Sequence, residues 1–166
     1  MSRVHMISRN LDIRDQIGPR CSAYAASCLE RYHGLQSEPL ELYERFFKLP
    51  DGSALPRSVG KKIGAKLCAN GTIRDIEKMI DEDEPVLILG FYDKDAYFDN
   101  LHYMLVAGYD EDYFYLADSL HGCGKKKYNR KVSREEFASM WDTSKCWLVK
   151  FIYGKNLLYR LNHIAA

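Results

Sequence analysis

The chain has 166 residues, of which 46% are apolar, and a formal net charge of +1. This length supports one domain with a substantial core, and the composition is typical of a globular protein. The near-zero charge argues against a broad nucleic-acid-binding face, and no apolar run resembles a secretory signal or a transmembrane helix. We therefore expect a single domain over residues 1–166, with no nucleic-acid partner and no membrane span.

The cysteines are odd in number and irregularly spaced, and they form no Cys-x-x-Cys pair; they are Cys21, Cys28, Cys68, Cys123 and Cys146. This pattern argues against a disulfide framework and against a structural zinc site. We expect no metal and no cofactor, and a reducing cytoplasmic location in which a thiol stays free. Export without a conventional signal, as for an injected effector, is the alternative.

The first half of the chain predicts helices. Residues 1–15 are polar and mixed, which indicates an arm or an edge strand. Helices are predicted from Cys21 to about His33, from Pro39 to the turn at 50–52, over 54–66, and from the N-cap Thr72 to the acidic run 81–84. The second helix is expected to bury a broad apolar face made of Leu40, Leu42, Tyr43, Phe46 and Phe47. The acidic run is expected to face solvent.

The second half predicts strands. Apolar runs indicate strands over 85–91, 102–109 and 113–118, with a turn at 110–112 that makes the last two an antiparallel hairpin. A Gly- and Lys-containing loop follows over 119–127, with Lys125–Lys127 solvated, and then a short strand over 128–132. A helix capped by Ser133 runs to Trp141, a last strand covers 146–153, and residues 157–164 form a short helix or tail. Helices first and an antiparallel sheet later indicate an α+β fold.

A tight turn with a thiol at its end stands out near the amino terminus. The segment Gln16-Ile17-Gly18-Pro19-Arg20-Cys21 leads directly into helix-forming, Ala-rich sequence. Cys21 is therefore expected at a helix N-terminus, where the helix dipole favours a thiolate. The turn can also hold the Gln16 side-chain amide beside the Cys21 backbone N–H, and two such donors form an oxyanion hole.

The predicted hairpin supplies an imidazole and a carboxylate. His102 begins one strand and Asp118 ends its partner, so an antiparallel pair brings both residues to the same end of the sheet. Asp118 can then accept a hydrogen bond from His102, and the other imidazole nitrogen is left to pair with Cys21.

These motifs resemble those of the papain-like cysteine peptidases, and more closely the bacteriocin-leader-processing (double-glycine) cysteine peptidases. The resemblance covers the order Gln16, Cys21, His102 and Asp118, and the later segment 133–141 with its Phe and Trp. It implies a papain-like fold with N-terminal helices packed on a C-terminal antiparallel sheet. It also implies Cys21 as nucleophile, His102 as general base and acid, Asp118 as orienting carboxylate and Gln16 as oxyanion donor.

The chain departs from that family at three points. Ser22 follows the Cys where the family commonly has Gly, and Arg20 precedes it where the transporter members have an acidic residue. The spacing from Gln16 to Cys21 is one residue shorter than in those members. We expect no transporter segment, and the departures leave the leader-peptide substrate less supported than the fold.

Each candidate also has a structural interpretation. Cys21 could be a packed core thiol, His102 a strand-edge residue, and Asp118 a turn residue that caps the next loop. His121 competes with His102 as the base, and a metal site using His121 and Cys123 is a further alternative that the spacing does not favour. Aromatic residues before His102 could line a substrate cleft or fill the core; these are Tyr92, Tyr97 and Phe98.

We predict a thiol-dependent hydrolase that cleaves a peptide or isopeptide bond of a peptide or protein substrate through a thioester intermediate. The same residues would serve an acyl transferase, a transglutaminase or a deamidase. A catalytically inactive peptide-binding module of the same fold is a further alternative. Sequence alone does not indicate the oligomeric state.

Overall fold

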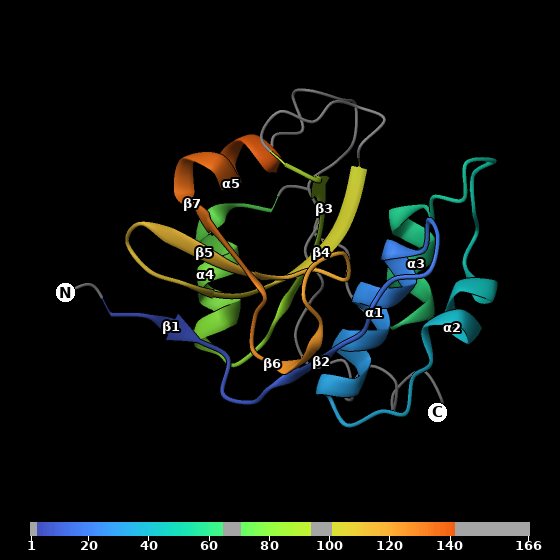
Figure 1. Ribbon diagram of the computed structural model, residues 1–166, viewed down its shortest axis with the longest axis horizontal. Coiled ribbons are helices and arrows are strands. Elements are labelled where there is room, and N and C mark those ends of the chain that lie inside the picture. Colours follow the sequence, from blue (N-terminus) through green and yellow to red (C-terminus); the bar gives the residue numbers. More distant parts are fainter. Residues whose placement is uncertain (1–2, 65–70, 94–100, 142–166) are drawn as a thin grey trace.

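The computed structural model describes residues 3–64, 71–93 and 101–141, and its helices lie on both sides of a central sheet (Figure 1). The strands in chain order are β1 His5–Met6, β2 Leu11–Ile13, β3 Val86–Phe91, β4 Leu101–Tyr109, β5 Tyr113–Ala117, β6 Gly124–Lys126 and β7 Arg130–Ser133. The helices are α1 Cys21–Tyr32, α2 Pro39–Arg45, α3 Pro56–Lys62, α4 Ile73–Asp81 and α5 Arg134–Met140. Helices precede most of the sheet, so the α+β prediction is confirmed.

The long strand β4 organises the main sheet. Strands β1 and β3 pair with it along one side, and β5 pairs along the other, followed by β7; all pairings are antiparallel. The predicted hairpin is present, with Leu105 opposite Ala117 and a register shift between Val106 and Gly108. A separate two-stranded sheet joins β2 to β6.

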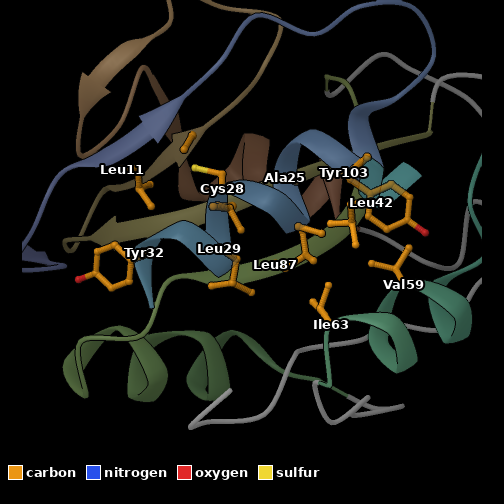
Figure 2. Close-up of a cluster of buried hydrophobic side chains, with 14 of the residues drawn as sticks. Leu11, Ala25, Cys28, Leu29, Tyr32, Leu42, Val59, Ile63, Leu87 and Tyr103 are labelled. Atoms are coloured by element: carbon orange, nitrogen blue, oxygen red, sulfur yellow. The ribbon is translucent and has the colours of Figure 1, made fainter. Parts of the chain in front are cut away.

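Helices cover both faces of the sheet, and this explains why its strands are continuous apolar runs rather than alternating ones. On one face α1, α2, α3 and β2 pack on the sheet, and Figure 2 shows Leu29 of α1 and Ile63 lying near Leu87 of β3. On the other face α4 and α5 pack around Phe114, Phe137 and Trp141. Neighbouring residues of β3 and β4 therefore belong to different core clusters.

Local sequence sets the helix ends. Thr72 and Asp75 form the predicted capping box at the start of α4, with side chain and backbone bonded in both directions. Ser133 caps α5 by accepting a hydrogen bond from the Glu136 N–H at 3.0 Å.

Two helices are shorter than predicted. Helix α3 ends at Lys62 instead of 66, because Gly64 adopts φ +66°, a left-handed conformation that stops a helix. Helix α2 ends at Arg45, so Phe47 falls outside it and is 66% exposed. Leu40 is also exposed, so the predicted broad apolar face of this helix is wrong at both positions.

Two polar segments differ from prediction. Residues 124–126, expected in a loop, form β6 because β2 offers them a partner, and Lys125 lies opposite Asp12 in that pair. The acidic run does not face solvent throughout, since Glu84 is buried and its carboxylate lies 2.9 Å from His33 Nε2. His33 follows the last residue of α1, as predicted.

Some predictions lie outside the described residues. They concern Cys68, Tyr97, Phe98, Cys146, the strand over 146–153 and the segment 157–164. Within the described ranges, no helix has the length and hydropathy needed to cross a bilayer.

A close backbone contact beside the site allows a test of the fold. Gly90 lies opposite His102, and a β-carbon there would lie 2.7 Å from the Met140 carbonyl oxygen, which is backbone and cannot easily move. We expect Gly90→Ala to lower the free energy of unfolding by about 1–3 kcal/mol, measured by equilibrium urea unfolding.

Gly122→Ala is the matched control, because a β-carbon at this position would have no described atom within 4 Å apart from those of its two chain neighbours. It should change stability by less than about 0.5 kcal/mol. Equal stability of the two variants would contradict the close approach of α5 to β3.

Candidate active site

Cys21 is the first residue of α1. The preceding turn is tight, with Gly18 at φ +64° and a hydrogen bond of 2.8 Å from the Arg20 N–H to the Gly18 carbonyl. The N-cap residue of α1, Arg20, makes no side-chain capping hydrogen bond, and the first turn of the helix contains no acidic residue. The half-buried thiol therefore lies where the helix dipole stabilises negative charge.

The register of the hairpin brings His102 and Asp118 together. His102 lies two residues before Met104 on β4, and Asp118 lies two residues after Leu116 of β5. Both residues therefore fall on the same face of the hairpin and toward the same end of it, past the pair Leu105–Ala117. His102 Nε2 lies 2.7 Å from Asp118 Oδ1, and both side chains are almost fully buried. The Cys21 thiol lies close enough to the same imidazole to raise its pKa, and Nδ1 is the ring nitrogen that Asp118 does not engage. The structure thus joins three of the predicted residues in one chain of contacts.

These contacts set the protonation of the buried pair. Burial acts to lower the pKa of His102, but the hydrogen bonds and negative charges of Asp118 and Cys21 outweigh it and raise that pKa to about 9. Burial likewise acts to raise the pKa of Asp118, but hydrogen bonds from His102 and Leu120 and the charges of His102 and His121 lower it. The pair therefore favours an imidazolium beside a carboxylate at neutral pH.

Gln16 lies beside the same loop. Its backbone N–H donates to the Ser119 carbonyl at 3.0 Å, and its Oε1 accepts from Ser119 Oγ at 2.8 Å. One N–H of its amide donates to the Gly18 carbonyl at 2.7 Å. These contacts fix Gln16 between the turn before Cys21 and the residue after Asp118.

Asp118 has further partners besides His102. Its Oδ1 also accepts from the Leu120 N–H at 2.9 Å, and its Oδ2 accepts from Arg130 Nη1 at 3.1 Å. Asn129 holds the backbone of Asp118 from both sides, accepting from its N–H at 2.8 Å and donating to its carbonyl at 2.7 Å. Leu120 is a local partner, as expected of a turn residue that caps the next loop. Arg130 and Asn129 are brought to Asp118 by the pairing of β5 with β7, and no local motif encodes that register.

His121, the competing base, contacts the carboxylate rather than replacing His102. Its Nε2 lies 3.5 Å from Asp118 Oδ2, and its ring stacks on Tyr92 with centroids 5.9 Å apart. Tyr92 also meets His102 edge-on at 5.6 Å, so it lies at the site and not in the distant core.

The other described cysteines differ from Cys21. Burial raises the pKa of Cys28 and of Cys123 to about 12 in each case, with Asp15 adding to the effect at Cys123. Cys28 is buried in the core, as predicted. Neither thiol supplies a thiolate near neutral pH.

No cluster of three potential ligands that could hold a metal ion occurs within the described ranges, so the His121–Cys123 metal alternative has no support there. Ser22, which stands where the family commonly has Gly, is buried, and its hydroxyl has no hydrogen-bond partner within the described part of the chain.

The fold and the thiol–imidazole–carboxylate cluster are features of cysteine peptidase-like hydrolases. The model of the Peptidase_C39 like family matches residues 16–148, and the chain belongs to this family. This confirms the resemblance drawn from the sequence and the assignment as a cysteine peptidase-like hydrolase.

Solved structures with the same fold include a C39-like peptidase candidate from Bacillus anthracis, with a TM-score of 0.68 and 18% identity, covering 91% of this chain and 98% of that one. The peptidase domain of Streptococcus ComA, a bi-functional ABC transporter involved in a quorum sensing pathway, has a TM-score of 0.62 and 16% identity, covering 89% and 100%. At these identities the likeness supports the fold, which is the predicted one. None of the curated proteins matches the sequence significantly.

The raised pKa of His102 gives a direct test of the pair. Following the imidazole proton signals by NMR, we expect His102 to titrate near 9 in the wild type. Replacing the carboxylate by an amide in Asp118→Asn removes a negative charge 2.7 Å from the ring, so the pKa should fall by about one unit or more.

Glu84→Gln is the matched control, because it removes the partner of the other buried histidine–carboxylate pair, His33–Glu84. It should leave the titration of His102 unchanged. A His102 titration near 6.5 in the wild type, or one that Asp118→Asn does not move, would contradict the coupling.

Proposed function

We propose that the protein is a thiol-dependent hydrolase that cleaves a peptide or isopeptide bond, with Cys21, His102 and Asp118 as a catalytic triad. The observation that supports this most directly is the buried imidazole of His102, whose Nε2 lies 2.7 Å from Asp118 Oδ1 and whose pKa is raised by both Asp118 and the Cys21 thiol. Membership of the peptidase family supports the reaction class.

In the resting enzyme His102 holds the proton that Cys21 has given up, and in the first step the thiolate attacks the substrate carbonyl carbon. The tetrahedral oxyanion accepts hydrogen bonds from the Cys21 backbone N–H and from the Gln16 amide. One Gln16 N–H already donates to Gly18, which orients the amide and leaves its second N–H for the oxyanion. His102 then gives its proton to the leaving amine, and a thioester remains.

In the second step His102 accepts a proton from water while the hydroxide attacks the thioester carbon. The C–S bond then breaks, which releases the carboxylic acid product and leaves the Cys21 thiolate beside the His102 imidazolium. Asp118 orients the imidazole and stabilises the imidazolium in both steps. The substrate is a peptide or protein chain, and a reducing compartment such as the cytoplasm would keep Cys21 and the other free thiols reduced.

The reactivity of the thiol tests the first step. Wild-type Cys21 should react quickly with iodoacetamide near neutral pH, because His102 can hold the thiol proton and the start of α1 stabilises the thiolate. His102→Ala should slow this reaction about tenfold or more, with intact-mass and peptide mapping locating the label.

The matched control is Cys28→Ala, which removes a buried thiol outside the site and should leave the labelling rate unchanged. Slow labelling of Cys21 in both the wild type and His102→Ala would contradict the triad and favour a packed thiol.

The products test the reaction type. Incubated with a proteome-derived peptide mixture in H₂¹⁸O, the wild type should yield new peptide ends with one ¹⁸O in each new carboxylate, and Cys21→Ala should lower the yield at least about 10³-fold. Joined peptides would instead favour acyl transfer. A change of Gln to Glu without chain cleavage would favour deamidation, and binding without turnover would favour an inactive peptide-binding module.

A further inference from the structure

Arg130 reaches Asp118 from a strand that the triad does not use. In the pairing of β5 with β7, Arg130 lies directly opposite Leu116, two residues before Asp118 on the same face of the sheet. Its side chain is 11% exposed, and Nη1 lies 3.1 Å from Asp118 Oδ2. The contact is therefore a buried charge-assisted hydrogen bond rather than a surface ion pair.

The two oxygens of Asp118 are divided between two sets of donors. Oδ1 accepts from His102 and from the Leu120 N–H, whereas Oδ2 faces Arg130 and His121. A carboxylate can turn about its terminal bond, so a partner on Oδ2 fixes the direction in which Oδ1 points. Arg130 is the permanently charged donor on Oδ2, because a guanidinium keeps its proton at all ordinary pH values. His121 is the weaker partner of Oδ2, since it lies farther away, at 3.5 Å, and its side chain is 34% exposed.

The guanidinium is itself confined. It lies over the ring of Tyr92, 5.1 Å from its centroid, and the same ring meets His102 edge-on. The neighbouring Asn129 clamps the Asp118 backbone through two hydrogen bonds. Arg130 and Asn129 thus position both the side chain and the main chain of Asp118.

We propose that Arg130 is a positioning residue that acts through Asp118, an inference that rests on the proposed triad. Arg130 holds Oδ2 so that Oδ1 stays aligned with His102. Its positive charge also stabilises the Cys21 thiolate. The charged and titratable side chains that contact this carboxylate are His102 from β4, His121 from the loop after β5 and Arg130 from β7. The Tyr92 ring, which follows β3, packs against all three of them. Cys21 completes the set on the far side of His102.

A merely structural ion pair would have a different effect. Its loss would lower the stability of the fold, but the pH at which the thiolate forms would stay the same. Loss of a positioning charge removes positive potential and loosens Asp118, and both effects make the thiolate less favourable. The alkylation profile of Cys21 against pH therefore separates the two roles.

The test compares wild type with Arg130→Gln, which keeps a hydrogen-bond donor and removes the charge, and Arg130→Lys, which keeps the charge. We expect the midpoint of the alkylation profile to rise by about one pH unit or more in Arg130→Gln. In Arg130→Lys it should stay closer to the wild-type value. Thermal unfolding of each variant checks that the compared proteins are folded, and if Arg130→Gln does not fold, the comparison uses Arg130→Lys and Asn129→Ala.

Lys131→Met is the matched control. It removes a positive charge from the next residue of β7, whose amine lies over Tyr113 and Tyr115 instead of facing Asp118. Its midpoint should equal that of the wild type.

The outcomes distinguish this inference from the proposed function. A wild-type thiol that reacts fast near neutral pH, with a midpoint unchanged in Arg130→Gln, would overturn the role of Arg130 and leave the triad standing. An equal shift in Lys131→Met would also overturn it, since any lost charge would then suffice. An ordinary thiol in the wild type would overturn both proposals.

Discussion

The Asp118 carboxylate has no exposed surface, and the geometry of the candidate site depends on how that buried charge is satisfied. A carboxylate removed from water is costly unless donors replace its hydration. Here the donors come from β4, from β7 and from the loop that follows β5. Each donor constrains the same side chain. The hydrogen bonds that this one buried carboxylate needs therefore hold segments that are distant in sequence in fixed positions relative to one another.

The two-sided burial of the sheet makes this arrangement rigid. Because α1 packs on one face and α4 with α5 on the other, β4 is buried along almost its whole length, and His102 has little freedom to move. Cys21 is fixed separately, as the first residue of a helix whose following residues fill the core. The thiol and the imidazole thus belong to different packed units that meet at the site.

The local sequence was sufficient to predict those elements whose structure depends on interactions between neighbouring residues. The capping box at Thr72, the start of α1 at Cys21 and the hairpin turn at 110–112 were predictable from a few neighbouring residues. Predictions were wrong where a distant partner intervened. Lys125 lies in a strand because β2 is beside it, and Glu84 can be buried because its carboxylate pairs with His33.

The sequence by itself determined the chain order of Gln16, Cys21, His102 and Asp118, the helical and strand-forming segments that hold them, and the resemblance to a peptidase family. Tertiary structure decided which groups surround Asp118. Arg130 and Asn129 reach it only through the register of β7 against β5, and a strand register depends on which side chains pack across the whole sheet. No short segment contains that information, so the contacts of Arg130 and Asn129 with Asp118 could be identified only from the folded chain.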